Sequence, residues 1–347
     1  MLKYRRQQDT VIAVDTENPQ GCWNIFKEMR TSKNAELTAR DIAKSLTSDQ
    51  KSQLQPFFEN SANDILFSSI MAMYDEEKKT GKQYANWHLC DFLNRVSLRK
   101  DAELSWYDLA ELRPGRFAHI LDYLGNESDE AYGIISELRT LLHNCFWGSF
   151  CSDQGEFSAI EALKTGGKRI FLYYDYANAS EASVKMFSTI LNLLFKHSVD
   201  PDNEKRTWFF IDEASLLPRS CVVDAMSLGR QYGFRLFICL QSAQLMTRHY
   251  CEAEANAQLC LFPNIICLKT MDSFTRKIFA DRYGECLCAY SFVNPMQKIV
   301  QHVVHRLVVA DYEFSMIQKK GDALCSIPAL NSAPFFYYGY REELKNE

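Results

Sequence analysis

The stretch RTWFFIDEASLLP, residues 206–218, decides the fold class of this chain. A short apolar run ends there at Asp212 and Glu213, a pattern that predicts a buried β-strand stopping at two adjacent carboxylates. Enzymes that hydrolyse nucleoside triphosphates use such a pair. One carboxylate orders a water on Mg²⁺, and the other polarises the water that attacks the γ-phosphate. The structural alternative is that Glu213 caps the next turn and Asp212 only ends the strand.

Strands and helices are expected to alternate on both sides of this stretch. Apolar runs predict strands at 10–15, 168–177, 207–212, 235–241 and 264–270, and amphipathic runs predict helices at 180–199, 220–233, 252–260 and 273–284. Strands that alternate with helices of ten or more residues form right-handed βαβ units. The sequence therefore predicts an α/β fold with a mostly parallel sheet and helices on both faces.

Polar residues stand where these apolar strands stop, namely Asp15, Asp175, Asp212, Glu213 and Gln241. In parallel sheets of this kind, ligands bind beyond the carboxyl ends of the strands. These five side chains are therefore the candidate ligand-binding edge.

Gln241 and Arg230 extend this hypothesis. Gln241 ends the strand after Asp212, where an amide could bond both a phosphate and the attacking water; the alternative is an ordinary turn residue. Arg230 ends the intervening helix, where it could complement the helix dipole or reach a neighbouring subunit's nucleotide and neutralise transition-state charge. Arg235 is a second candidate for that role.

The chain is predicted to have three parts. Residues 86–157 repeat apolar positions at three- and four-residue spacing without a strand signal, which predicts an all-α subdomain. We expect it to be inserted between a first α/β part at 1–85 and the remainder of that domain at 158–347.

Composition excludes some classes of protein. The formal net charge of −5 gives no general attraction to nucleic acid, so DNA contact would need a local basic patch or a pore. The twelve cysteines are scattered and many lie in apolar runs, which favours reduced core thiols in a cytoplasmic protein. The sequence contains no apolar run of about 18 or more residues and therefore predicts no membrane span.

A phosphate-binding loop of the form GxxxxGK[ST] does not occur in the 347 residues. The nearest sequence is TGGKRIF at 165–171, which lacks the first glycine, has Arg169 in place of Ser or Thr, and precedes a strand that a P-loop would follow. We therefore expect this chain alone to lack the groups that bind the β- and γ-phosphates.

Three stretches taken in order, TWFFIDEASLLP, GRQYGFRLFICLQSAQLM and SFTRKIFADRYG, resemble the type IV coupling proteins of the TraD and TrwB kind, which are related to the FtsK and HerA DNA pumps. The resemblance implies a RecA-like P-loop NTPase fold that uses ATP and Mg²⁺. It assigns Asp212 and Glu213 to the Walker B position, with Asp212 holding Mg²⁺ through water. Gln241 would sense the nucleotide, and Arg230 lies where an arginine finger would be.

The same resemblance implies partners. Members of this family act as homo-hexamers anchored at the inner membrane, where they pass single-stranded DNA and the attached relaxase of the relaxosome to a type IV secretion channel. The all-α part would select the cargo, and the present residues would be the cytoplasmic motor region.

The missing phosphate loop leaves three explanations, namely a P-loop encoded just upstream, a P-loop supplied in trans, or a degenerate relative that keeps the fold for binding. The functional hypotheses are correspondingly the motor region of a conjugative coupling protein, a catalytically inactive adaptor for relaxosome or secretion partners, and an FtsK/HerA-type pump outside conjugation.

Overall fold

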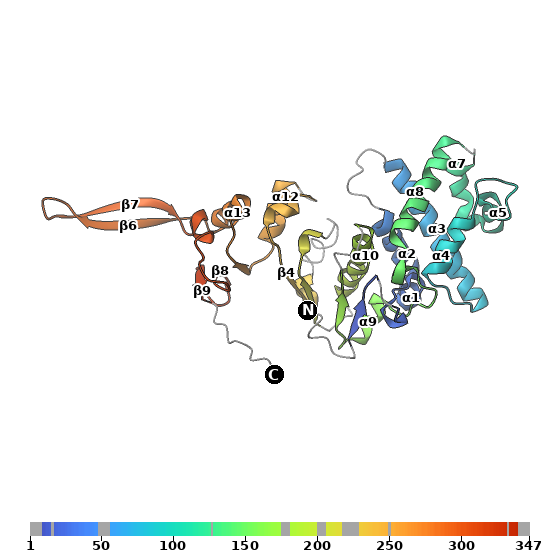
Figure 1. The fold of residues 1–347 in the computed structure, drawn as a ribbon, viewed down its shortest axis with the longest axis horizontal. Coiled ribbons are helices and arrows are strands. Elements are labelled where there is room, and N and C mark those ends of the chain that lie inside the picture. Colours follow the sequence, from blue (N-terminus) through green and yellow to red (C-terminus); the bar gives the residue numbers. More distant parts are fainter. Residues whose placement is uncertain are drawn as a thin grey trace. The chain divides into compact units, whose positions relative to one another are not determined.

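The chain contains both helices and strands, which confirms the predicted α/β class (Figure 1). A computed structural model describes residues 9–14, 17–47, 56–125, 128–174, 181–199, 206–216, 229–248, 251–331 and 333–338. The chain divides into two compact units, Met1–Phe210 with Leu216–Phe237, and Ile211–Ser215 with Ile238–Glu347.

The first unit holds the larger share of the helices. Its elements are β1 Thr10–Ile12, η2 Pro19–Gly21, α1 Ile25–Thr31, α2 Ala35–Thr47, α3 Pro56–Thr80, α4 Asn86–Arg95, α5 Trp106–Leu112, α6 Pro114–Phe117, η3 Ala118–Ile120, α7 Leu121–Leu124, α8 Asp129–Cys145, η4 Gly148–Cys151, α9 Ala159–Thr165, β2 Ile170–Leu172, α10 Glu181–Ser198, β3 Thr207–Ile211, η6 Arg230–Tyr232 and β4 Phe234–Ile238. The last residue of β3 and of β4 is grouped with the second unit.

The second unit combines short helices with antiparallel strands. Its elements are η5 Ala214–Leu216, whose last residue belongs to the first unit, η7 Ala243–Arg248, α12 Glu252–Cys260, β5 Ile265–Cys267, α13 Ser273–Tyr283, β6 Glu285–Val293, β7 Ile299–Leu307, η8 Asp311–Phe314, β8 Ala323–Ser326 and β9 Phe335–Tyr337. The sequence predicted α12, α13 and β5, and α13 ends, as expected, before Gly284 at positive φ (+68°).

The helical core forms because each helix has one apolar stripe. In α2, Ala39, Ile42, Ala43 and Leu46 recur at three- and four-residue spacing and are fully buried where α2 packs on α3 and α10. Described residues between 86 and 157 form helices and short turns. The three-part domain division itself stays a prediction.

α3 is the longest helix, at 25 residues. Its surface carries several charged side chains, two of which bind the segment around α6: Asp75 pairs with Arg116 at 3.0 Å and Glu76 with Arg113. No helix in the described ranges is long and apolar enough to cross a membrane.

Two buried asparagines join segments that are far apart in the sequence. The Asn86 side chain accepts from Ile25 N (2.9 Å) and donates to the carbonyl oxygens of Trp23 (2.8 Å) and Phe150 (3.0 Å). Asn24 caps the first turn of α1 through its side-chain oxygen. Because these amides are buried and fully bonded, they fix α4 against the start of α1 and against η4.

The carboxylate of Glu28 is a second buried link, between α1 and α9. It is 0% exposed and accepts four hydrogen bonds, from Trp23 Nε1 (2.7 Å), Ser158 Oγ (2.6 Å), Ala159 N (2.6 Å) and Ile160 N (3.1 Å). The last three donors belong to the first turn of α9 and its cap, where a negative charge is favourable. Burial raises the pKa of Glu28, and the hydrogen bonds oppose part of that rise.

β1 and β2 pair in parallel, as the sequence predicted for neighbouring strands of this fold. Thr10 lies opposite Ile170 and Ile12 opposite Leu172, and Tyr173 N continues the ladder to Ile12 O at 2.9 Å. The two strands therefore end together, immediately before the segments that carry Asp15 and Asp175.

β3 pairs with β4, and α10 covers one face of this pair. The Phe195 ring of α10 packs against Phe209 of β3 and Phe234 of β4, with ring centroids 4.8 Å and 5.4 Å apart. These edge contacts anchor the strand that leads into Asp212 and Glu213.

The sequence predicted a buried strand at 207–212, but the described residues bury only one face of β3. Trp208 and Phe210 are 61% and 60% exposed, stacked with an interplanar angle of 9°, and Phe237 of β4 packs against Phe210. A parallel strand covered on both faces reads as a continuous apolar run. Here that run has an inner face on α10 and an outer aromatic face that no described residue buries.

The second unit contains a long hairpin that was not predicted from the sequence. β6 and β7 pair antiparallel from Glu285 opposite Leu307 to Val293 opposite Ile299, and Figure 1 shows the hairpin reaching away from β8 and β9. Asn294 closes its turn by accepting from Lys298 N at 2.9 Å. The available signal was the turn-forming Asn294 between a run with Tyr290 and Phe292 and a run rich in Ile and Val.

Candidate nucleotide-binding edge

The carboxyl ends of β3 and β4 carry three of the predicted site residues. Asp212 and Glu213 follow β3 directly, and Gln241 follows β4. Two backbone hydrogen bonds join these ends beyond the strands, from Cys239 N to Ile211 O at 2.8 Å and from Ala214 N to Cys239 O at 3.1 Å. The structure thus places the acidic pair and the glutamine on neighbouring strand ends within one unit.

Glu213 is half-buried and already bonded within its own turn. Its Oε1 accepts from the backbone N of Ser215 at 3.4 Å and from the Ser215 hydroxyl, and Ser215 is buried. This is the turn-capping contact that the structural alternative required. Asp212, in contrast, is exposed to solvent.

The segment after Gln241 is anchored on the first turn of α13. Ser242 Oγ donates to Asp272 Oδ2 at 2.6 Å, and Ala243 N donates to Thr275 Oγ1 at 2.8 Å. Asp272 also caps α13, accepting from Phe274 N and Thr275 N at 3.2 Å each. Burial acts to raise the pKa of Asp272, but these hydrogen bonds outweigh it and the pKa is lowered.

Asp272 and Thr275 were not among the site residues predicted from the sequence. An aspartate directly before a helical run is an N-cap signal, so Asp272 could have been identified as a cap. Its bond to Ser242 joins residues 30 positions apart and has no local signature. This bond gives the strand end with Gln241 a fixed support.

The electrostatic potential at these strand ends is negative, because Asp212 and Glu213 carry the charges there. Burial raises the pKa of the Cys239 thiol, and the charges of Asp212 and Glu213 raise it further. Mg²⁺ keeps several waters and takes one or two carboxylates together with phosphates, so the exposed Asp212 carboxylate fits a magnesium ion held through water. The described residues contain no group of three or more potential metal ligands, which a protein-only metal site would need.

The other predicted site residues are only partly described. Arg230 begins the helical turn η6, which ends at Gly233 with φ +73° as the sequence predicted; its side chain lies outside the described part. Arg235 donates from Nη1 to Phe234 O at 2.8 Å. Asp15 and Asp175 also lie outside the described residues.

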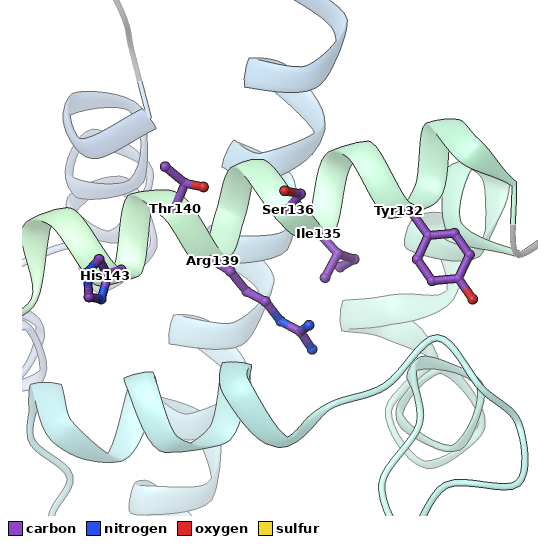
Figure 2. Close-up of a pocket in the computed structure, with 6 residues that line it drawn as sticks. All are labelled: Tyr132, Ile135, Ser136, Arg139, Thr140 and His143. Atoms are coloured by element: carbon purple, nitrogen blue, oxygen red, sulfur yellow. The ribbon is translucent and has the colours of Figure 1, made fainter.

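A surface hollow of about 480 Å³ lies on α8. Figure 2 shows its six lining side chains projecting from this one helix: Tyr132, Ile135, Ser136, Arg139, Thr140 and His143. Ligand sites bury most of the ligand between several elements. This open depression contains none of the predicted site residues and has no feature of an enclosed ligand site.

Comparison with known proteins identifies relatives of the chain. The sequence profile described as "Type IV secretion-system coupling protein DNA-binding domain" matches residues 3–291. No curated protein matches the chain significantly.

Solved structures share its fold. The unbound bacterial conjugative coupling protein TrwBdeltaN70 superposes with a TM-score of 0.71 at 18% identity, over 92% of this chain and 71% of that protein. TrwB in complex with ADP and Mg²⁺ gives a TM-score of 0.68 at 18% identity, over 93% and 72%. VirB4 of Thermoanaerobacter pseudethanolicus gives 0.52 at 12% identity, over 97% and 78%.

Proposed function

Because the chain belongs to the family of type IV secretion-system coupling protein DNA-binding domains, we propose that it is the motor region of a conjugative coupling protein. In this role it binds single-stranded DNA and the attached relaxase, and ATP hydrolysis drives their transfer toward a secretion channel. The observation that carries the proposal is the joined pair of strand ends, with Asp212 and Glu213 on one and Gln241 on the other.

Each residue has a proposed part in hydrolysis. Asp212 orders a magnesium-bound water, and Glu213 polarises the water that attacks the γ-phosphate. For that task Glu213 must exchange its bond with Ser215 for one with water. Gln241 bonds the nucleotide and reports its state along β4. Bound Mg²⁺ would neutralise charge on the β- and γ-phosphates.

Arg230 is the proposed arginine finger. It begins η6, on the connection from β3 to β4, and in a homo-hexamer it would reach the nucleotide of the adjacent subunit. The nucleotide that TrwB holds in its solved complexes supports ATP and Mg²⁺ as the ligands of this family. These 347 residues contain no GxxxxGK[ST], so hydrolysis in this role would need a phosphate-binding loop from other residues.

A catalytically inactive adaptor for relaxosome or secretion partners is the second candidate function. Two observations favour it, namely the absent GxxxxGK[ST] sequence and the bond that engages Glu213 in its own turn. In an adaptor, the acidic pair would have only the structural role of ending β3 and capping the next turn.

Thermal unfolding with and without Mg²⁺–ATP separates the two functions. For the protein purified as its gene encodes it, we expect Mg²⁺–ATP at about 100-fold over its dissociation constant to stabilise by about 2.7 kcal/mol, raising Tm by a few degrees. Asp212→Ala should abolish this shift, because the ion loses its ordered water. An unchanged Tm in the unsubstituted protein, with Asp212→Ala equally silent, would establish the adaptor instead.

A further inference from the structure

Two cysteines from distant parts of the chain meet where α4 lies against η4. Backbone and side-chain bonds hold the turn on both sides of Cys151, from Asn86 Nδ2 to Phe150 O at 3.0 Å and from Trp87 N to Ser152 O at 3.3 Å. Cys90 lies three and four residues beyond those donors, on the same face of α4. The fold therefore places its thiol over Cys151.

The two thiols differ in exposure and in acidity. Cys90 is 7% exposed and Cys151 is partly exposed, and the Cys90 thiol donates a hydrogen bond to the Cys151 sulfur. This bond and then burial raise the pKa of Cys90, whereas the same bond lowers the pKa of Cys151 to about 7, against the opposing effect of burial. Cys151 therefore carries more thiolate near neutral pH than an ordinary cysteine.

We propose that Cys90 and Cys151 form a reversible thiol oxidation site whose substrate is a small hydroperoxide, with Cys151 as the attacking thiol and Cys90 as the resolving thiol. Three features of the structure support this site: the two thiols face each other, only Cys151 is open to solvent, and the turn that carries Cys151 is hydrogen-bonded to α4 on both sides.

The chemistry balances in two steps. The Cys151 thiolate attacks the terminal oxygen of hydrogen peroxide, the O–O bond breaks, and Cys151 becomes a sulfenic acid while hydroxide leaves and takes up a proton as water. The Cys90 sulfur then attacks the sulfenic sulfur, the S–S bond forms, and a second water leaves. Two thiols are oxidised, one peroxide is reduced to two waters, and an added thiol reverses the reaction by exchange.

A Cys90–Cys151 disulfide would join α4 covalently to η4. It would close a loop of about 60 residues that contains α5 to α8, and cross-links over long loops constrain the unfolded chain most. The turn that carries Cys151 is also bonded to the end of β1, because Ser149 N donates to Val14 O (2.8 Å) and Ser149 Oγ to Ala13 O (2.5 Å). Oxidation would thus tie α4 to the strand that leads into Asp15.

A second close thiol pair provides the contrast. Cys286 and Cys288 have sulfur atoms 3.7 Å apart, but they lie two residues apart on the single strand β6. Residues at that spacing have Cα atoms about 6.6–6.8 Å apart, at the upper limit of disulfide geometry. Cys251 and Cys260 are exposed and serve as controls, because their rate of oxidation shows the effect of solvent access alone.

Disulfide mapping of the whole protein tests the proposal. The reduced protein is treated with hydrogen peroxide in small excess, blocked with iodoacetamide under denaturing conditions, digested without reduction and analysed by mass spectrometry. We expect a cross-linked peptide pair containing Cys90 and Cys151, formed at least about 10-fold faster than oxidation of Cys251 or Cys260. The proposal is overturned if Cys151 oxidises no faster than those two cysteines, or if it links to another cysteine.

Two variants separate the roles of the thiols. With Cys90→Ser, whose hydroxyl can still donate to the Cys151 sulfur, the sulfenic acid at Cys151 should persist and be captured by dimedone. With Cys151→Ser, Cys90 should stay reduced under the same treatment. Circular dichroism before oxidation reports whether each variant folds, and the mapping of the unsubstituted protein decides the question if either does not. Loss of dimedone capture in folded Cys90→Ser, or oxidation of Cys90 in folded Cys151→Ser, would contradict the assignment.

Discussion

Replacing Glu28 with alanine is expected to lower the free energy of unfolding by about 3–5 kcal/mol. The substitution removes the acceptor of four buried hydrogen bonds, including two from the backbone of α9. Each buried donor left unsatisfied costs about 1–3 kcal/mol, and the space around the truncated side chain adds to that cost. The loss should therefore exceed that of an ordinary surface substitution several-fold.

Chemical denaturation followed by circular dichroism measures this loss, and Glu36→Ala is the matched control. Glu36 also lies in the first turn of a helix, but its side chain is 53% exposed and its partner is Arg40 at 3.2 Å. Such a surface pair contributes at most about 1 kcal/mol. Glu28→Gln, which keeps the volume and one acceptor oxygen, should fall between the two. Equal stabilities for Glu28→Ala and Glu36→Ala would show that the buried link does not hold α1 to α9.

Glu213→Gln is expected to reduce ATP hydrolysis by at least about 100-fold in the protein as its gene encodes it. An amide preserves the shape and the contact with Ser215, but it cannot accept a proton from water. Nucleotide binding should therefore survive while turnover stops, so the thermal shift with Mg²⁺–ATP should stay as large as in the unsubstituted protein.

Glu254→Gln is the matched control for this prediction. Glu254 is half-buried like Glu213, and in the capping box of α12 it accepts a hydrogen bond from the backbone N–H of the N-cap residue Cys251 at 3.1 Å. Phosphate release measured under saturating ATP should be unchanged in this variant. A Glu213→Gln protein that hydrolyses ATP as fast as Glu254→Gln would remove Glu213 from the catalytic role and leave it as a turn cap.

The local features of the fold were readable from the sequence. Apolar runs gave the positions of β1 to β5, and Gly233 and Gly284 gave the ends of two helical segments, because a left-handed residue is a local requirement. The order of the acidic pair, the helix end and the glutamine along the chain can also be predicted from local sequence alone. For this reason the candidate edge could be predicted as a set of strand ends.

Features that depend on distant contacts were not readable. Glu28 accepts hydrogen bonds from residues about 130 positions further along the chain. Nothing next to Glu28 in the sequence indicates that its carboxylate is buried. The exposed outer face of Trp208 and Phe210 could not be predicted either, since a continuous apolar run is the same whether one or two faces are covered. Tertiary packing, not local pattern, decides both.

Binding of single-stranded DNA tests most directly whether this chain works as a coupling-protein domain. A fluorescein-labelled oligothymidylate is titrated with the protein and followed by anisotropy at several salt concentrations. We expect saturable binding whose affinity falls linearly with salt on logarithmic axes, because lysine and arginine side chains that contact phosphates release counterions. Since the net charge is −5, this slope would demonstrate a local basic surface. No saturable binding at the lowest salt, or an affinity that salt does not change, would contradict the account.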